Sequence, residues 1–337
     1  YDDKTSAIKV TLRKKTDGGK TVAGAVTEDF IGDSYYGWTI ENPKDMTMTA
    51  RNFDGSYTEF SKDDNNGFYI VADTIEDDFS FDEYYSDIKN SFSGTTLVKA
   101  EKGESDGVRT MHFQGRSKES FVNMLCYFTD KYMYIVYGVF SDADEAAKNE
   151  YIRITESFKL SFSKDGTYDL STVVDGMRTF KSDLIALEMN VPANYYLLNE
   201  DESINSFRFV KNSGGSYIHI AVTSKSDAKS ASELAEKDRK LNSEVMNEAL
   251  VTTSEISECE YAGISGSFYT QTIKGSLKSD GIIKDVFFDN GDYVYNISVM
   301  FNTEEDKNDE ELMEKILSSV KVKTPDSSKI GTVLRND

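Results

Sequence analysis

A nine-residue aromatic pattern occurs twice in the chain, and it constrains the fold more than any other feature. Tyr132–Phe140 and Tyr293–Phe301 both read Tyr-x-Tyr-x-aliphatic-x-x-x-Phe. Because alternate residues of a strand point to the same face of a sheet, each segment is predicted to be a strand with one face buried under a helix. The residues predicted to be buried are Tyr134, Val136, Phe140, Tyr295, Ile297 and Phe301.

Other elements recur in the same order, which is the signature of an internal repeat. Pro43 and Pro192 each follow a strand-like segment, and a hairpin comes next in both halves, with turns at 63–67 and 212–215. A capping box then starts a helix, Ser80–Glu83 in one half and Ser230–Glu233 in the other. The helical faces predicted to be apolar are Tyr84, Ile88 and Phe92, and Leu234, Leu241 and Val245.

The two halves also end with the same sequence of elements. An acidic stretch follows the aromatic strand, at 142–145 and 304–311, and a short helix ends near Ser157-Phe158 or Ser319-Val320. Acidic residues complement the dipole at a helix N-terminus, so these stretches have a structural explanation. Each half therefore reads as strands, hairpin, helix, strands and helix, an order that favours an antiparallel sheet over βαβ units.

The predicted fold class is α+β, with two tandem copies of an antiparallel β-sheet packed with helices. Residues 1–162 are predicted to hold the first copy and an N-terminal tether, and 163–173 a linker. Residues 174–325 hold the second copy, and 326–337 a C-terminal tail. Asp165-Gly166 lies at the polar joint.

The charge of the chain narrows the range of possible functions. The net charge is −21 and the longest basic cluster is Arg13–Lys15, so the chain lacks the basic surface that nucleic-acid binding needs. The chain starts at Tyr1 and contains no apolar run of about 18 residues. We expect an exported protein with a removed leader, touching the membrane only through a removed N-terminal lipid anchor.

Residues for nucleophilic or metal chemistry are few. His112 and His219 are the two histidines, and both fall on predicted strands; His219 is expected to be exposed. Cys126 and Cys259 have no metal-like spacing, and two buried free thiols are expected, although an inter-domain disulfide stays open. Residues 263–267 resemble a nucleophile elbow but fail its Gly-x-Ser-x-Gly spacing.

Two acidic clusters could in principle form a calcium site or a catalytic carboxylate pair. Residues 63–67 place a glycine fifth, where a calcium loop requires it sixth, so a hairpin turn is predicted. A second cluster precedes a helix and could supply the acid and base of a glycosidase, but capping explains it as well. Its members are Glu76, Asp77, Asp78, Asp82 and Glu83. An aromatic cluster, Tyr35, Tyr36 and Trp38, is expected to fill a core or cover a sheet edge.

The element order resembles a known group. A strand ending in proline, a hairpin, a capped helix, an aromatic strand and a closing helix ending Ser157-Phe158 are similar to the PsbP-like fold, an α-β-α sandwich. The group includes DcrB-type and LpqN-type bacterial lipoproteins. The resemblance covers about 120 residues of each half and implies an extracytoplasmic, non-enzymatic accessory protein. It carries no catalytic motif to this chain.

These observations predict a non-catalytic binding or scaffold module, secreted or anchored to the bacterial cell surface. No catalytic residue, cofactor or metal ligand is expected. The expected partner is a protein, peptide or glycan, and not a nucleic acid. The alternative is a carboxylate-dependent hydrolase acting on cell-wall or other sugars, which a cleft holding two acids, one with a raised pKa, would favour.

Overall fold

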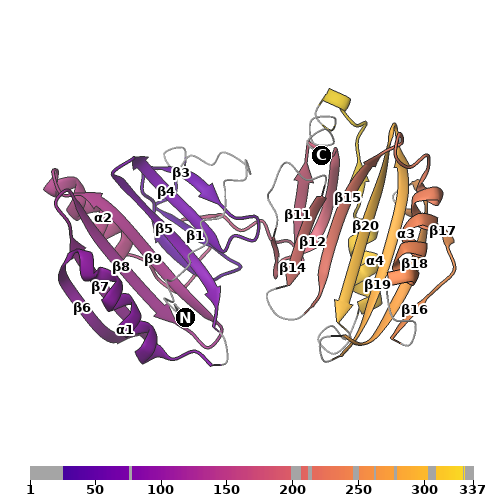
Figure 1. The fold of residues 1–337 in the computed structure, drawn as a ribbon. Helices are drawn as coiled ribbons and strands as arrows, with labels where there is room; N and C mark the ends of the chain where they lie inside the picture. Colours follow the sequence, from indigo (N-terminus) through magenta and orange to yellow (C-terminus); the bar gives the residue numbers. More distant parts are fainter. Residues whose placement is uncertain are drawn as a thin grey trace. The chain divides into compact units, whose positions relative to one another are not determined.

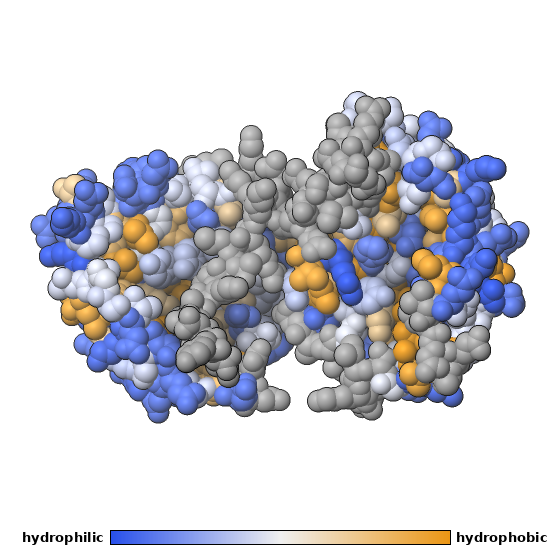
Figure 2. All heavy atoms as spheres, in the orientation of Figure 1, coloured by the Kyte–Doolittle hydropathy of each residue, from blue (hydrophilic) through white to orange (hydrophobic). Residues whose placement is uncertain are grey.

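A computed structural model describes residues 26–75, 78–198, 206–211, 215–245, 250–261, 263–276, 279–302, 309–328 and 330. The chain divides into two compact units, unit 1 (Tyr1–Ser171) and unit 2 (Thr172–Asp337). Over the described residues, no helix is long and apolar enough to cross a membrane. Hydrophilic residues and small groups of hydrophobic ones alternate over the face of each unit seen in Figure 2.

Unit 1 is built on a seven-stranded sheet in the order β3-β4-β5-β9-β8-β7-β6, in which every neighbouring pair is antiparallel. Its strands are β3 (Thr47–Arg51), β4 (Tyr57–Asp63), β5 (Asn66–Thr74), β6 (Thr96–Ser105), β7 (Val108–Arg116), β8 (Ser120–Phe128) and β9 (Tyr132–Ser141). Strands β6 to β9 form a meander, and β9 then pairs with β5 of the hairpin (Figure 1).

One helix packs on each face of this sheet. Helix α1 (Phe81–Ser91) and the 3-10 turn η2 (Phe92–Gly94) cover one face, where Ile88 packs with Phe113. Helix α2 (Glu145–Glu156) covers the other, where Ile154 packs with Val136. Tyr134, Val136 and Phe140 are at most 3% exposed, which confirms the predicted strand register.

A small second sheet adds to the α2 side. Strand β1 (Phe30–Asp33) pairs antiparallel with β2 (Trp38–Glu41) and parallel with β10 (Thr167–Asp169). Trp38 is 1% exposed and its ring stacks on Phe158 at 6.0 Å between centroids. Strand β10 lies within the stretch expected to be a linker.

Unit 2 has a sheet in the order β13-β14-β15-β20-β19-β18-β16, with β17 also paired to β18, and all its pairs are antiparallel. Its strands are β13 (Tyr195–Leu197), β14 (Ser206–Lys211), β15 (Tyr217–Ser224), β16 (Val251–Thr253), β17 (Ser257–Tyr261), β18 (Ile264–Ser276), β19 (Ser279–Asn290) and β20 (Tyr293–Asn302). The hairpin β14–β15 and the final strand β20 correspond in order to β4–β5 and β9 of unit 1.

Helices α3 (Ala231–Val245) and α4 (Asp309–Ser318) take the two faces of the unit 2 sheet. Ala231 and Ala235 pack against Tyr269 on one face, while Ile297 lines a small hollow with Leu317 on the other. Tyr295, Ile297 and Phe301 are fully buried, as predicted.

The predicted apolar face of α3 is confirmed for Leu234, which packs on the core beneath the helix, and is wrong for Leu241, which is 58% exposed; the side chain of Val245 lies outside the described residues. The helix instead rests on two alanines followed by two polar residues, Asp238 and Asn242, spaced four, three and four apart. Leu241 lies about 100° around the helix from Asn242, so it points away from the sheet.

A three-stranded sheet of β11 (Met177–Ser182), β12 (Leu187–Pro192) and β21 (Lys321–Val322) completes unit 2. In unit 1 an isolated antiparallel bridge joins Thr39 of β2 to Lys159. Strand β12 ends at Pro192 and pairs with β21 through Glu188 and Lys321.

The predicted start and turn signals are present. The Ser80 and Ser230 hydroxyls accept hydrogen bonds from the backbone N–H groups of Glu83 and Glu233, at 3.4 and 3.2 Å. Residues 63–67 form the β4–β5 turn, and Gly291, with φ +60°, allows the β19–β20 turn. The 212–215 turn falls mostly outside the described residues.

Candidate functional site

A groove of about 640 Å³ opens on the α2 side of the unit 1 sheet. Its floor comes from β6, β7 and β8, and its wall from the end of α2 and the segment 158–161. We call it the β6–β7 groove. Its lining includes Glu101, Asp106, Thr110, His112, Tyr127, Glu156 and Phe158.

The wall of the groove is fixed to the small sheet. The backbone N–H and C=O of Lys159 exchange hydrogen bonds with those of Thr39, both at 2.9 Å, and the Thr39 hydroxyl donates to the Ser161 carbonyl. The Glu41 N–H donates to the Ser157 hydroxyl oxygen at 2.9 Å. Because these hydrogen bonds already fix the wall, a ligand that binds there does not have to order it, and the entropic cost of binding is lower.

His112 is the titratable group at the centre of the floor. The Asn123 amide nitrogen donates to Thr155 Oγ1 at 2.9 Å, so Asn123 Oδ1 must accept. His112 Nε2 lies 2.8 Å from that oxygen and therefore carries the proton in the neutral ring. Nδ1 is then left as the acceptor of the imidazole.

Burial lowers the pKa of His112 below its ordinary value, outweighing the hydrogen bond to Asn123 and the charge of Glu156. The Glu156 carboxylate lies 3.6 Å from Nε2, and this contact is an ion pair only if the ring is protonated. Because the ring is neutral at pH 7, His112 adds polarity but no charge to the groove.

A second polar region lies beneath α3 in unit 2. Cross-strand neighbours Ser298, Asp285 and Tyr269 form a row on the face that α3 covers. His219 continues the row on β15, and Arg208 on β14. Burial raises the pKa of Asp285 to about 6, helped by the charge of Asp238 and opposed by the hydrogen bond from the Ser298 hydroxyl.

Helix α3 reaches this row with its polar residues. The Tyr269 hydroxyl donates to Asp238 Oδ2 at 2.5 Å and accepts from the Asn242 amide at 2.9 Å. Asp285 is 5% exposed and Tyr269 is fully buried. The pKa of the Asp285 carboxyl is therefore raised, but a substrate has little access to this buried group.

The members of the sequence's acidic cluster that the structure describes, Asp78, Asp82 and Glu83, do not form an acid–base pair. Glu76 and Asp77 lie outside the described residues. Asp82 lies 2.5 Å from Lys102, and this hydrogen-bonded ion pair lowers its pKa, which is opposite to what a general acid needs. Glu83 contributes its backbone N–H to the Ser80 cap.

The two cysteines, His219 and residues 264–267 all lie in β-strands. Cys126 is buried and Cys259 half-buried, and both are free, so the expectation of two buried thiols holds only for the first. His219 is half-buried, and burial, with the charge of Arg208, lowers its pKa. Residues 264–267 begin strand β18. No group of three or more His, Cys, Asp or Glu side chains that could hold a metal occurs among the described residues.

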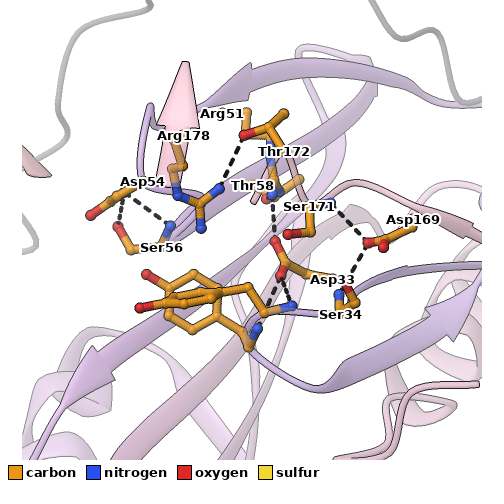
Figure 3. Close-up of polar contacts among 12 residues, drawn as sticks. Asp33, Ser34, Arg51, Asp54, Ser56, Thr58, Asp169, Ser171, Thr172 and Arg178 are labelled. Atoms are coloured by element: carbon orange, nitrogen blue, oxygen red, sulfur yellow. Dashed lines mark hydrogen bonds and ion pairs between the residues drawn. The ribbon is translucent and has the colours of Figure 1, made fainter. Parts of the chain in front are cut away.

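The aromatic cluster is largely a core element. Tyr36 and Trp38 are buried, and the turn that carries them is held by Asp33, whose carboxylate accepts the N–H groups of Tyr35 and Tyr36 at 2.8 and 3.0 Å. The same carboxylate, whose side chain is fully buried, lies 2.5 Å from the guanidinium of Arg51 (Figure 3). This arrangement joins β1–β2 to the main sheet.

Sequence reasoning missed the groove and Asp285. Glu101, Tyr127 and Glu156 come from three elements, and no local pattern unites them. Asp285 did have a signal, since it directly precedes the apolar run Val286–Phe288.

No protein-family model and no curated protein matches the chain. Solved structures that are similar to parts of it include cyanobacterial PsbP from Synechocystis, at 9% identity and TM-score 0.33, covering 45% of this chain and 96% of that one. The Saccharomyces cerevisiae Ran-binding protein Mog1p is similar at 12% identity and TM-score 0.32, covering 45% and 98%.

The immunity protein TplEi of the Pseudomonas aeruginosa T6SS is similar at 10% identity and TM-score 0.26, over 88% of this chain and 98% of that one. A Bacteroides thetaiotaomicron structure is similar at 12% identity and TM-score 0.31, and the chain covers about half of it, 49%. At such identities and TM-scores, no conclusion about ligand or activity follows.

Proposed function

We propose that this protein is a non-catalytic binding module that holds its ligand in the β6–β7 groove. The observation that carries the proposal is the groove itself, a preformed hollow of about 640 Å³ whose wall is hydrogen-bonded to β2. Preformed concave sites with a few converging polar groups are where ligands bind most often.

The state of His112 supports binding over catalysis. In a catalytic dyad or triad a carboxylate stabilises the imidazolium that forms when histidine takes a proton. Here Nε2 donates to the neutral amide oxygen of Asn123, and burial outweighs the charge of Glu156, whose carboxylate lies 3.6 Å away, so that the charged ring is disfavoured. His112 is therefore suited to accept a hydrogen bond at Nδ1 and poorly suited to act as a base.

We further propose that the two units are copies of one PsbP-like α+β domain. Hydrogen bonds at corresponding positions of the two units support this proposal. Tyr134 donates to the Tyr36 carbonyl and Tyr295 to that of Ile185, both at 2.7 Å. The hydroxyls of Ser157 and Ser319 likewise accept from the backbone N–H groups of Glu41 on β2 and Asn190 on β12, at 2.9 and 2.8 Å.

The proposed setting is extracytoplasmic, secreted or anchored to the bacterial cell surface. The support is the resemblance described above and an acidic composition with net charge −21. Cell fractionation of the native host, followed by protease treatment of intact cells, tests this. Protection of the chain from external protease together with recovery in the cytosolic fraction would rule it out.

Binding at the groove is tested by obstructing it. Thr110→Trp places a large ring on the floor, and Lys118→Trp makes the same change at the exposed β7–β8 turn. Wild type and both variants are labelled and applied to peptide and glycan arrays. We expect ligands bound by the wild type and by Lys118→Trp to be lost from Thr110→Trp. Binding that is equal in all three proteins would place the ligand elsewhere.

A second candidate, a carboxylate-dependent hydrolase acting on sugars, has one observation in its favour. Asp285 has its pKa raised to about 6 and feels the charge of Asp238, as a general acid beside a second carboxylate would. Incubation of wild type and Asp285→Asn with peptidoglycan and polysaccharides tests it. Turnover by the wild type that the variant lacks would establish this candidate over simple binding.

A further inference from the structure

Two carboxylates flank the neutral imidazole on the floor of the β6–β7 groove. Glu101 of β6 is the cross-strand neighbour of His112, and Glu156 at the end of α2 lies 3.6 Å from the same ring. Both side chains are partly exposed, at 67% and 43%. Asp106 adds a third carboxylate at the β6–β7 turn.

The neighbouring lysines neutralise these acids only in part. Lys102 points to the opposite face of the sheet, where its ammonium lies 2.5 Å from Asp82 and 4.3 Å from the centroid of Tyr85. Lys99 lies 3.3 Å from Glu101, and Lys159 supplies a cation at the far wall. Glu156 is left facing a ring that carries no charge.

Resting on the proposed binding function, we propose that the groove takes an extended peptide carrying a lysine or arginine, whose cationic head lies between Glu101 and Glu156. Opposite charges attract strongly where part of the surrounding water is excluded. The net charge of −21 also draws cationic partners toward the chain from a distance.

The shape of the groove fits such a segment. Its floor follows β6 from Glu101 to Ser105, a length of about 13 Å, which an extended chain of about five residues spans. Tyr127, half-buried, packs its ring 5.0 Å from that of Phe158. Lysine and arginine stems pack along apolar surfaces of this kind, and their heads bind ring faces.

The test uses two variants of equal charge. Glu101→Gln/Glu156→Gln removes both groove carboxylates, and Glu104→Gln/Glu119→Gln removes two exposed ones from β6 and the β7–β8 turn. Eight-residue fluorescent peptides containing two lysines, two acetyl-lysines or two glutamates are titrated by anisotropy at low and moderate salt. Because both variants change the net charge equally, non-specific attraction cancels from the comparison.

We expect the lysine peptide to bind wild type, and the groove variant to raise its Kd by about tenfold, as the loss of two partly exposed ion pairs implies. The control variant should raise Kd by less than half of that factor, that is, by under about fivefold. Equal weakening in both variants, or tighter binding of the acetylated or glutamate peptide, would overturn the cationic assignment.

The outcomes separate this inference from the function on which it rests. If the arrays find neutral glycans or acidic peptides that Thr110→Trp no longer binds, the groove is a binding site and the cationic assignment is wrong. If Thr110→Trp loses no ligand at all, the binding function of the groove fails, and this inference fails with it.

Discussion

Replacing Asp285 by asparagine should make unit 2 more stable at neutral pH. The carboxyl is 5% exposed beneath α3, and its pKa in the folded chain is about 6 against an ordinary value of 3.8. Each pKa unit corresponds to about 1.4 kcal/mol, so burying the ionised form costs about 3 kcal/mol. Asparagine avoids that cost and keeps an oxygen that can accept from Ser298.

The sign of the pH dependence follows from the raised pKa. Below about pH 4 both the folded and the unfolded chain carry the proton, and Asp285 contributes no penalty. Between about pH 4 and 6 the unfolded chain loses its proton first, so the free energy of unfolding falls as pH rises. Above pH 6 the full penalty of about 3 kcal/mol is present. The advantage of Asp285→Asn should therefore be near zero at pH 4 and greatest at pH 7.5.

Urea unfolding of the full chain at pH 4, 6 and 7.5 measures this, with hydrogen exchange of peptides from β18, β19 and β20 as the readout. Trp38 is the single tryptophan and lies in unit 1, so its fluorescence reports the other unit and should not change. Glu258→Gln, on exposed β17, is the control. A difference between variant and wild type that stays constant across these pH values would refute the assignment of a buried, protonated Asp285.

Three further outcomes are expected. Tyr134→Phe should lower the free energy of unfolding of unit 1 by about 1–3 kcal/mol, since the buried carbonyl that its hydroxyl reaches loses its donor; denaturant titration of Trp38 fluorescence measures it. Arg51→Met should cost unit 1 about 3–5 kcal/mol in the same assay, because the buried carboxylate of Asp33 loses the cation with which it pairs; a cost under 1 kcal/mol would contradict this. With a maleimide at pH 7.5, Cys259 should react before Cys126, whose burial raises the pKa of the thiol; mass spectrometry of digests ranks the two.

Local signals in the sequence were sufficient for much of the architecture. The alternation in Tyr132–Phe140 predicted the buried face of β9, and the Ser80 and Ser230 caps predicted the starts of α1 and α3. These features depend on residues close together in the chain. Period and capping chemistry act over one strand or one helical turn, so they can be read without knowing the tertiary structure.

Features built from distant residues could not be predicted in this way. The β6–β7 groove needs Glu101 and Glu156 to meet across a sheet, and no spacing rule connects them. The apolarity of leucine predicts that Leu241 lies on the buried face of α3, yet the sheet beneath offers the Tyr269 hydroxyl, which hydrogen-bonds to Asp238 and Asn242. The partner surface, and not the helix, decides which face is buried.

The pairing of β5 with β9 has a consequence for how unit 1 folds. Strands β6 to β9 are joined by tight turns, so their contacts form between residues near in sequence, whereas Ile70 of β5 meets Val136 only after α1 and the entire meander. Closing that long loop carries an entropic cost that the later contacts must repay. The meander is thus placed to form early and the hairpin to dock late, so weakening β5–β9 contacts should speed unfolding more than it slows folding.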